Sequence, residues 1–148
     1  MVANRELAVI KELRGDSRQA LTEVGRKLLI PGGSLFKLVR SLKEEGIIRK
    51  YCSLVDFSRL GYSVRVNLYV SVREKEKFQE FMLAHPSVNS LSRVMGDRFL
   101  AELVFVDMLE LDGFLERLWE FGVQSKDVFH VVEEFKNEGF EPVTTTFK

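Results

Sequence analysis

Apolar residues recur every three or four positions through the first 51 residues, which is the spacing of amphipathic helices. Turn signals divide this stretch into three predicted helices. The first follows Asn4 and ends at Gly15, the second begins near Thr22, and the third runs from Ser34 to a stop at Gly46. The residues predicted to face inward are Leu7, Ile10, Leu13, Val24, Leu28, Leu29, Leu35, Leu38, Val39 and Leu42.

A turn and a strand complete this region. Residues 30–33 contain Pro31 followed by two glycines, a composition typical of a turn between helices. Residues 47–55 are rich in β-forming types and follow the third helix, in the position of a wing strand. The first 51 residues are therefore predicted to form a winged helix-turn-helix domain.

Beyond residue 62 the spacing of apolar residues changes. They alternate with polar residues from 64 to 72, which predicts a half-buried strand. The elements predicted next are a helix over 74–84, strands over 88–95 and 99–106, a helix over 108–121 and a strand near 128–135. Gly96 lies between the two middle strands and predicts a hairpin. This β-α-β-β-α-β order is the ferredoxin-like arrangement, with two helices on one face of a sheet.

The two patterns together predict an α+β chain of two domains. We assign residues 1–51 to the winged helix-turn-helix domain, residues 52–62 to a linker and residues 63–148 to the ferredoxin-like domain. Residues 137–148 show no pattern that assigns them to an element.

The distribution of charge separates the same two parts, although the formal net charge is +0. Residues 1–51 contain eleven Lys or Arg and six Asp or Glu, whereas residues 52–148 contain eleven and sixteen. A basic domain is typical of a surface that binds a polyanion such as DNA, because each neutralised phosphate releases counterions. Duplex DNA is therefore the predicted partner of the first domain.

Other residue types limit the remaining chemistry. Cys52 is the only cysteine, which excludes an internal disulfide and fits a reducing compartment. No apolar run approaches the length of about 18 residues that a membrane span needs, and no signal peptide is evident, so we expect a cytoplasmic protein. His85 and His130 have no Cys or carboxylate at metal-ligand spacing. We predict no metal, no cofactor and no catalytic residue.

Several short motifs, in their order and spacing, resemble the Lrp/AsnC (feast/famine) family of prokaryotic transcription regulators. The motifs are Thr22-Glu23-Val24, Val39-x-x-Leu42-x-x-Glu45-Gly46-Ile47-Ile48, Val55-Asp56, Leu60-Gly61-Tyr62 and Gly96-Asp97. The resemblance spans nearly the whole chain. It implies a winged helix-turn-helix joined to a ferredoxin-like effector domain, homodimers built through the sheets, and often octamers whose dimer–dimer contacts bind amino acids.

The chain departs from the family pattern in both domains. Pro31 and Gly33 replace small polar residues, so we expect the third helix to start late. Leu38 replaces a common Arg, and Lys37 and Arg40 are close enough to substitute for it. In the second domain, the family's Gly-x-Tyr-Asp hairpin is replaced by a different sequence over residues 96–99.

The candidate DNA-binding residues are Ser34, Lys37, Arg40, Lys43, Arg49 and Lys50. In this interpretation the third helix enters the major groove, Ser34 contacts a phosphate or a base edge, and the cations hold the phosphate backbone. Arg49 and Lys50 would contact phosphate from the wing. The alternative interpretation of the same charges is a solvated helix face.

Gly96, Asp97 and Arg98 are the candidate effector-binding residues. A glycine hairpin exposes backbone N–H groups, Asp97 can bind an ammonium group, and Arg98 can bind a carboxylate. The alternative is an ordinary hairpin with charged tips, which the absence of the Tyr-Asp pair favours. Tyr69, at the centre of the strand over 64–72, indicates a subunit interface on the polar face of the sheet.

The predicted function is a homo-oligomeric transcription regulator that binds duplex DNA and responds to a small effector. The alternative is a ligand-sensing or assembly protein whose degenerate helix-turn-helix no longer binds specific DNA. A third interpretation is an enzyme like a distant branch that decarboxylates tetrapyrroles, with His130 as proton donor. No nucleophile-base pair or phosphate loop supports it.

Overall fold

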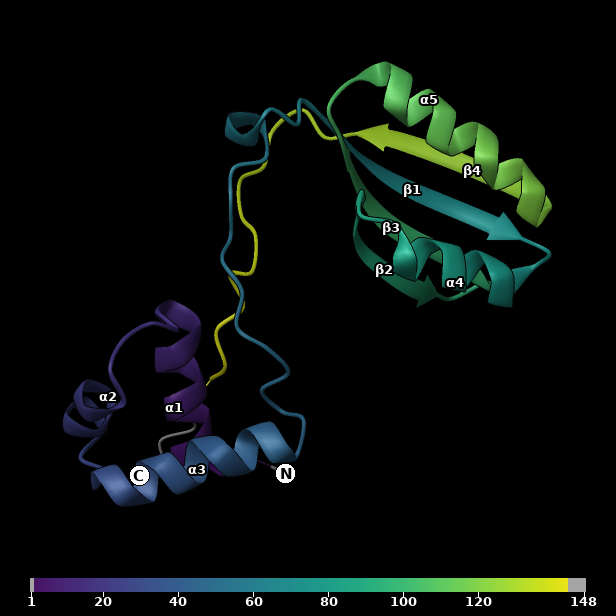
Figure 1. Cartoon of the computed structure of the whole chain (residues 1–148). Coiled ribbons are helices and arrows are strands. Elements are labelled where there is room, and N and C mark those ends of the chain that lie inside the picture. The colour runs from purple at the N-terminus through teal and green to yellow at the C-terminus, as the bar shows by residue number, and fades with distance from the viewer. Residues whose placement is uncertain (1, 144–148) are drawn as a thin grey trace. The chain divides into compact units, whose positions relative to one another are not determined.

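The structure is a computed structural model that describes residues 2–143 (Figure 1). It divides into two units. The first contains the residues up to Leu54 together with the C-terminal segment that begins at Lys136, and the second is Val55–Phe135. No helix among the described residues is long and apolar enough to cross a membrane. The same residues contain no group of His, Cys, Asp and Glu side chains placed to hold a metal ion.

Three helices form the first unit: α1 (Asn4–Gly15), α2 (Leu21–Leu28) and α3 (Gly32–Glu44). Their core consists of Val9, Leu13, Val24, Ile30, Leu35 and Val39. The predicted inward face of α3 is therefore confirmed at its centre. The predicted face of α1 is rotated, because Val9 and Leu13 are buried whereas Leu7 and Ile10 are half-buried. The N-cap of α1 is Ala3 and not Asn4, and the Ala3 N–H donates to the Glu6 carboxylate at 2.7 Å.

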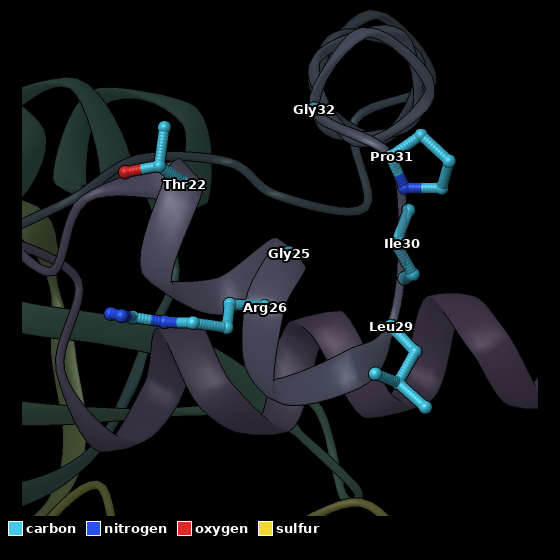
Figure 2. Close-up of a pocket in the computed structure, with 7 residues that line it drawn as sticks. All are labelled: Thr22, Gly25, Arg26, Leu29, Ile30, Pro31 and Gly32. Atoms are coloured by element: carbon cyan, nitrogen blue, oxygen red, sulfur yellow. The ribbon is translucent and has the colours of Figure 1, made fainter.

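The turn between α2 and α3 differs from the prediction at Leu29 (Figure 2). The sequence predicts that Leu29 faces inward, but it is 90% exposed and has a left-handed backbone with φ of 56°. The next residue, Ile30, fills the core position and donates its N–H to the Gly25 carbonyl at 2.8 Å. A Cβ on Gly25 would lie 2.8 Å from the Ile30 carbonyl oxygen, so this close turn needs glycine there.

Replacing Leu29 by glycine is expected to stabilise the first unit by about 0.5–1 kcal/mol, because the left-handed conformation strains residues that carry a Cβ. The Leu29 side chain is exposed, so its removal costs little packing. Urea unfolding followed by far-ultraviolet circular dichroism measures the change. L29A is the matched control, since alanine keeps the Cβ. An L29G protein no more stable than L29A would contradict the assignment of strain.

Helix α3 begins earlier than its glycines lead us to expect. Pro31 is its N-cap, and the Pro31 carbonyl accepts a hydrogen bond from the Leu35 N–H at 2.9 Å. Gly32 and Gly33 are thus the first two helical residues. Gly46, with φ of 73°, follows the C-terminal end of the helix as predicted.

The strand predicted over residues 47–55 as a wing is absent, because no described residue between α3 and β1 is in a strand. The segment contains a single extended stretch, and a strand forms only when a second stretch pairs with it. The short helix η1 (Ser58–Leu60) follows, and the Asp56 carboxylate accepts hydrogen bonds from the Ser58 hydroxyl and N–H. The hydrogen bond from the Ser58 hydroxyl lowers the pKa of Asp56.

The second unit has the predicted ferredoxin-like order. Its elements are β1 (Val64–Val72), α4 (Lys75–Ala84), β2 (Val88–Val94), β3 (Arg98–Phe105), α5 (Met108–Arg117), η2 (Leu118–Phe121) and β4 (Val123–His130). The strands form one antiparallel sheet in the order β2-β3-β1-β4, and α4 and α5 cover one face of it (Figure 1). The prediction for the last strand is wrong in position, since β4 begins directly after Gly122 and ends before residue 131.

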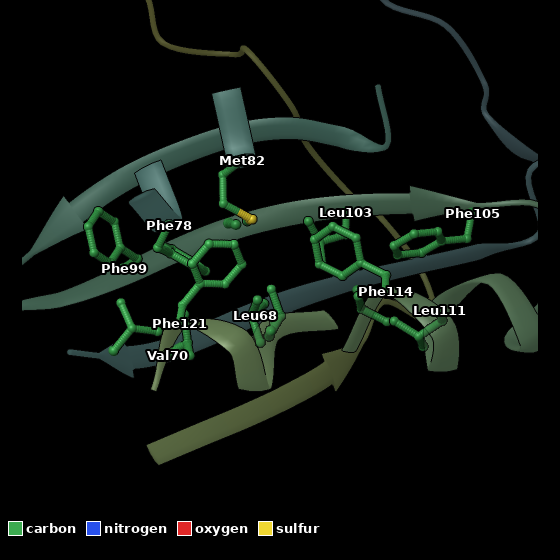
Figure 3. Close-up of a cluster of buried hydrophobic side chains, with 14 of the residues drawn as sticks. Leu68, Val70, Phe78, Met82, Phe99, Leu103, Phe105, Leu111, Phe114 and Phe121 are labelled. Atoms are coloured by element: carbon green, nitrogen blue, oxygen red, sulfur yellow. The ribbon is translucent and has the colours of Figure 1, made fainter. Parts of the chain in front are cut away.

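The core of the second unit lies between the sheet and its two helices (Figure 3). The alternation predicted for β1 is confirmed, with every apolar residue from Val64 to Val72 buried except Tyr69 on the opposite face. Phe78 from α4 is fully buried, and its ring centroid lies 4.9 Å from that of Phe99 and 5.8 Å from that of Phe121. Aromatic rings therefore fill much of this core.

Both histidines lie in this unit. His85 follows α4, and its ring packs against Phe81 and Phe114 with centroid distances of 5.4 and 4.9 Å. Burial, assisted by the charge of Arg117, lowers the pKa of His85. This is the packing of a helix end, as the sequence indicates for this residue. His130 is exposed at the end of β4.

The C-terminal segment contacts the first unit. Arg14 of α1 donates from Nε to the Phe140 carbonyl at 2.7 Å and from Nη2 to the Glu138 carbonyl at 3.0 Å. Lys11 lies 3.5 Å from the Glu141 carboxylate. The sequence groups residues 136–148 with the second domain, and these contacts place their described part with α1 instead.

Candidate DNA-binding surface and effector hairpin

Helix α3 presents one exposed stripe opposite its buried side chains. Gly33, Phe36, Lys37 and Arg40 follow one another at spacings of one to three residues that keep them on the same helix face. All four are exposed. Leu35, Val39 and Leu42 on the opposite face are buried. The stripe is thus held at the surface by the packing of the other side of the helix.

The three predicted cations of α3 have different surroundings. No hydrogen bond or ion pair engages Lys37 among the described residues. Arg40 Nε lies 2.9 Å from Glu44 Oε1, and this exposed pair contributes only about 0.3–0.5 kcal/mol. Lys43 Nζ lies 4.9 Å from the centroid of the Tyr51 ring. Lys37 and Arg40 are therefore the cations of this helix that an anion can reach at least cost.

The other predicted DNA-binding residues lie beside this stripe or beyond the helix. Ser34 is exposed in the first turn of α3. Arg49 and Lys50 are exposed in a segment without regular secondary structure and not on a wing strand. α3 and the chain that follows it thus bring all six residues into the first unit.

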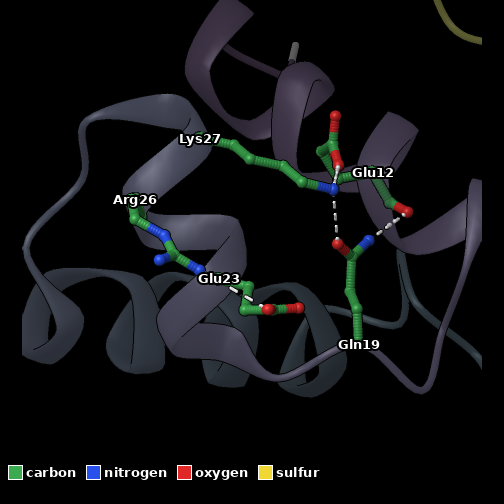
Figure 4. A network of polar contacts seen from close by, with 5 residues as sticks. All are labelled: Glu12, Gln19, Glu23, Arg26 and Lys27. Atoms are coloured by element: carbon green, nitrogen blue, oxygen red, sulfur yellow. Dashed lines mark hydrogen bonds and ion pairs between the residues drawn. The ribbon is translucent and has the colours of Figure 1, made fainter.

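Basic residues on α2 are engaged by neighbouring acids (Figure 4). Lys27 Nζ lies 3.1 Å from Glu12 Oε2 and 3.0 Å from Gln19 Oε1, which connects α2 to α1. Arg26 Nη2 lies 3.4 Å from Glu23 Oε1. These contacts brace the helices that support α3 and reduce the charge that α2 presents.

A shallow pocket of about 440 Å³ lies where α2 turns into α3 (Figure 2). The turn residues Leu29, Ile30, Pro31 and Gly32 line it. Arg26 of α2 completes the polar part of its wall. The start of α3 is therefore next to a concave, mostly apolar surface.

The effector candidates meet in the hairpin between β2 and β3, but two of them are already engaged. Met95, Gly96 and Asp97 separate the paired residues Val94 and Arg98, and Gly96 and Asp97 have left-handed backbones with φ of 83° and 59°, as in a tight hairpin turn. The Asp97 carboxylate contacts both Arg93 and Lys75. The Arg98 guanidinium lies 4.9 Å from the centroid of the Tyr69 ring. These contacts are those of an ordinary hairpin with charged tips.

The uncovered face of the sheet contains a polar cluster that the sequence does not indicate. Arg65 Nη2 lies 2.8 Å from Glu102 Oε2 and 2.5 Å from Glu134 Oε2. Asn89 donates to the same Glu102 carboxylate at 2.5 Å. Burial by itself would lower the pKa of Arg65. The hydrogen bonds to the two carboxylates outweigh this effect, so the pKa of Arg65 is raised. The pairing register of the strands brings Arg65, Asn89 and Glu102 together.

No family model matches the sequence. Among curated proteins, the HTH-type transcriptional regulator LrpC of Bacillus subtilis is 32% identical over 130 residues, covering 86% of this chain and 88% of LrpC. The chain belongs to the Lrp/AsnC family. The HTH-type transcriptional regulator LrpA of Pyrococcus horikoshii is 28% identical over 107 residues, which are 71% of this chain and 76% of that protein. This Lrp/AsnC chain is a helix-turn-helix transcription regulator.

Solved structures of Lrp/AsnC proteins share the fold. The structure of B. subtilis LrpC superposes with a TM-score of 0.82 at 24% identity, covering 92% of this chain and 98% of LrpC. The transcriptional regulator NMB0573 of Neisseria meningitidis, solved as a complex with L-Met, gives a TM-score of 0.83 at 21% identity, covering 93% and 94%. The predicted α+β class and the family resemblance are both confirmed. The relatives are named as regulators and not as enzymes.

Proposed function

We propose that this Lrp/AsnC regulator reads duplex DNA with α3 and that Lys37 and Arg40 hold the phosphate backbone. The observation that carries this proposal is the exposed stripe of α3, in which one cation has no partner among the described residues and the other has only a weak one. Ser34 in the first turn is the polar side chain nearest the start of the helix. Arg49 and Lys50 supply further contacts to phosphate from the segment that follows α3.

The charge of the first unit supports the same proposal. Contacts with acids occupy Arg26 and Lys27 of α2, so positive charge is left free mainly along α3 and the chain after it. Lys43 lies over the Tyr51 ring and adds to the positive field of this surface. A regulator that binds DNA in this way works in the compartment that holds the DNA, which is the cytoplasm of a prokaryote.

We further propose that two copies associate through the uncovered face of the sheet. Tyr69 lies at the centre of this face, paired with Leu100 on β3 and Asp127 on β4. Leu100 is 41% exposed and Phe129 is 58% exposed on the same face. Exposed aromatic and aliphatic side chains at the centre of a polar sheet face favour a subunit interface. A dimer formed there would carry two α3 helices, and octamers would be assemblies of such dimers.

An amino-acid effector is the third part of the proposal, and the L-Met complex of the Neisseria regulator supports it. Gly96, Asp97 and Arg98 are the residues that the sequence offers for this site. Lys75 and Arg93 neutralise Asp97, so an effector ammonium would have to displace them. The backbone N–H groups of the hairpin and the Arg98 guanidinium remain the better ligands for a carboxylate.

A regulator that no longer reads DNA is the second candidate function. Pro31 and Gly33 at the start of α3, and Leu38 in place of a cation, motivate it. The first of these reasons is weaker in the folded chain, because α3 includes Gly33 as regular helix. Such a protein would act through hetero-oligomers with a relative that still binds DNA.

Binding to the duplex upstream of the protein's own gene, measured across a salt series, tests the proposal. We expect sequence-dependent binding whose logarithm falls linearly with the logarithm of salt concentration, with a slope of about −0.9 for each phosphate contact. A scrambled duplex of equal length is the control. Equal binding to both duplexes, or binding to neither, would favour the degenerate reader.

A further inference from the structure

The exposed stripe of α3 contains a large apolar side chain. Phosphate binding by the cations of this stripe does not explain its presence. Phe36 is 60% exposed and lies between Gly33 and Arg40 on the face that carries the cations. It belongs neither to the core of the first unit nor to the partly buried residues packed against it. No aromatic or cation-π contact engages its ring among the described residues.

The start of α3 makes Phe36 one of the first side chains that can reach a base. The N-terminal residues of a recognition helix are those that contact base edges. Gly32 and Gly33 have no side chain, and apart from adjacent residues and the backbone of α3 itself, no described atom lies within 4 Å of where their Cβ atoms would be. The backbone of this first turn can therefore approach the groove closely, which brings Ser34 and Phe36 to its floor.

A phenyl ring can recognise only one feature of the major groove. Every base edge there presents hydrogen-bond donors or acceptors, and thymine alone adds an apolar group, its 5-methyl. A ring against this methyl removes apolar surface from water on both partners. A ring against the cytosine amine or the guanine oxygen would instead leave a polar group without a partner. Phe36 thus favours thymine and disfavours a G·C pair at the same position.

We propose that Phe36 is a specificity-determining residue of this regulator and contacts the 5-methyl group of a thymine in the major groove. The proposal rests on the proposed function, because it requires α3 to be the DNA-reading helix. Lys37 and Arg40 lie on the same stripe as the ring, where they hold the phosphate backbone. In this proposal the cations contribute affinity for any duplex, and Phe36 contributes a preference for sequences with thymine at the contacted position.

Two forms of the same duplex test the proposal. The upstream region is amplified once with dTTP and once with dUTP, which removes every 5-methyl group and keeps Watson–Crick pairing. The wild-type protein should bind the uracil duplex about 4-fold more weakly if Phe36 meets one thymine methyl, and about 15-fold more weakly if each of two half-sites contains one. The F36A variant should bind the thymine duplex more weakly than the wild type and should bind both duplexes equally.

Two further variants separate this contact from other causes. K37A removes a phosphate contact, so it should weaken binding to both duplexes while keeping their ratio. F36L keeps an apolar side chain and should keep part of the preference for thymine. F36A should fold, because the ring is exposed, and thermal unfolding checks this.

The outcomes are distinguishable. Equal binding of the wild type to both duplexes would overturn the role of Phe36 and leave the proposed function intact. If F36A keeps the wild-type ratio of affinities for the two duplexes, the effect of uracil comes from the shape of the DNA. That result would also overturn the role of Phe36. Absence of sequence-dependent binding to the thymine duplex would overturn the proposed function together with this inference.

Discussion

Removal of Lys37 and Arg40 from α3, in the variant K37A/R40A, is expected to weaken duplex binding by about 10- to 100-fold at about 0.1 M salt. Each lysine or arginine that holds a phosphate contributes about one unit of salt slope, so the slope should fall by about two. Both side chains are exposed, and the surface pair with Glu44 is the only partner that Arg40 gives up among the described residues. Fluorescence anisotropy of a labelled duplex across a salt series measures both quantities.

The control for this experiment removes two cations elsewhere. Lys77 and Arg59 are exposed and pair with acids three positions away, at 3.6 Å in both cases. K77A/R59A therefore changes the net charge by the same amount as K37A/R40A without altering α3. Equal reductions of affinity in the two double variants would indicate that net charge, and not this helix face, controls binding.

Replacing Phe78 by alanine is expected to lower the free energy of unfolding of the second unit by about 3–5 kcal/mol. Phe78 is fully buried, and its ring packs against those of Phe99 and Phe121. The substitution removes this packing and leaves a cavity between α4 and the sheet. Trp119 is the only tryptophan of the chain and lies in this unit, so its fluorescence during urea unfolding reports the change.

L83A is the matched control for F78A. Leu83 lies on the same helix and is exposed, so its truncation should change stability by no more than about 0.5 kcal/mol. If F78A unfolded at the same urea concentration as L83A, the ring cluster would not be the centre of this core.

Periodicity in the sequence predicts the elements whose two faces differ strongly in polarity. β1 is the clearest case, since burial alternates with every residue from Val64 to Val72. The sequence misplaces β4 because it is an edge strand with polar residues at several half-buried positions, such as Ser125 and Lys126. The residues after it are more apolar and fit a strand better by composition. Strand pairing, and not local polarity, decides where β4 lies.

Leu29 shows a second limit of reasoning from sequence. Its spacing fits the apolar face of α2, but the turn into α3 requires one residue with positive φ. Glycine normally supplies this conformation. Residues 26–31 contain no glycine, so the sequence does not indicate a positive φ here. The packing of Ile30 in the core imposes the conformation on Leu29. Such a position is recognised only when the tertiary structure is known.

The candidate sites are predictable to different degrees. The period of α3 brings Lys37 and Arg40 to the surface, and the sequence alone indicates this. The salt bridges of Asp97 with Lys75 and Arg93 depend on how α4, β2 and the hairpin meet, which the sequence does not reveal. The exposure of Phe36 is not predictable from the sequence, because an aromatic residue in an amphipathic helix is usually assigned to the core.

The C-terminal segment contacts α1, so truncating the chain after the first three helices removes part of the first unit. The second unit is an insertion within the first, because the chain leaves the first unit at Leu54 and re-enters it at Lys136. A fragment ending at Leu54 would therefore lack the carbonyl groups that Arg14 binds. The helix-turn-helix of this regulator is thus part of a discontinuous unit, completed only after the second unit has been synthesised.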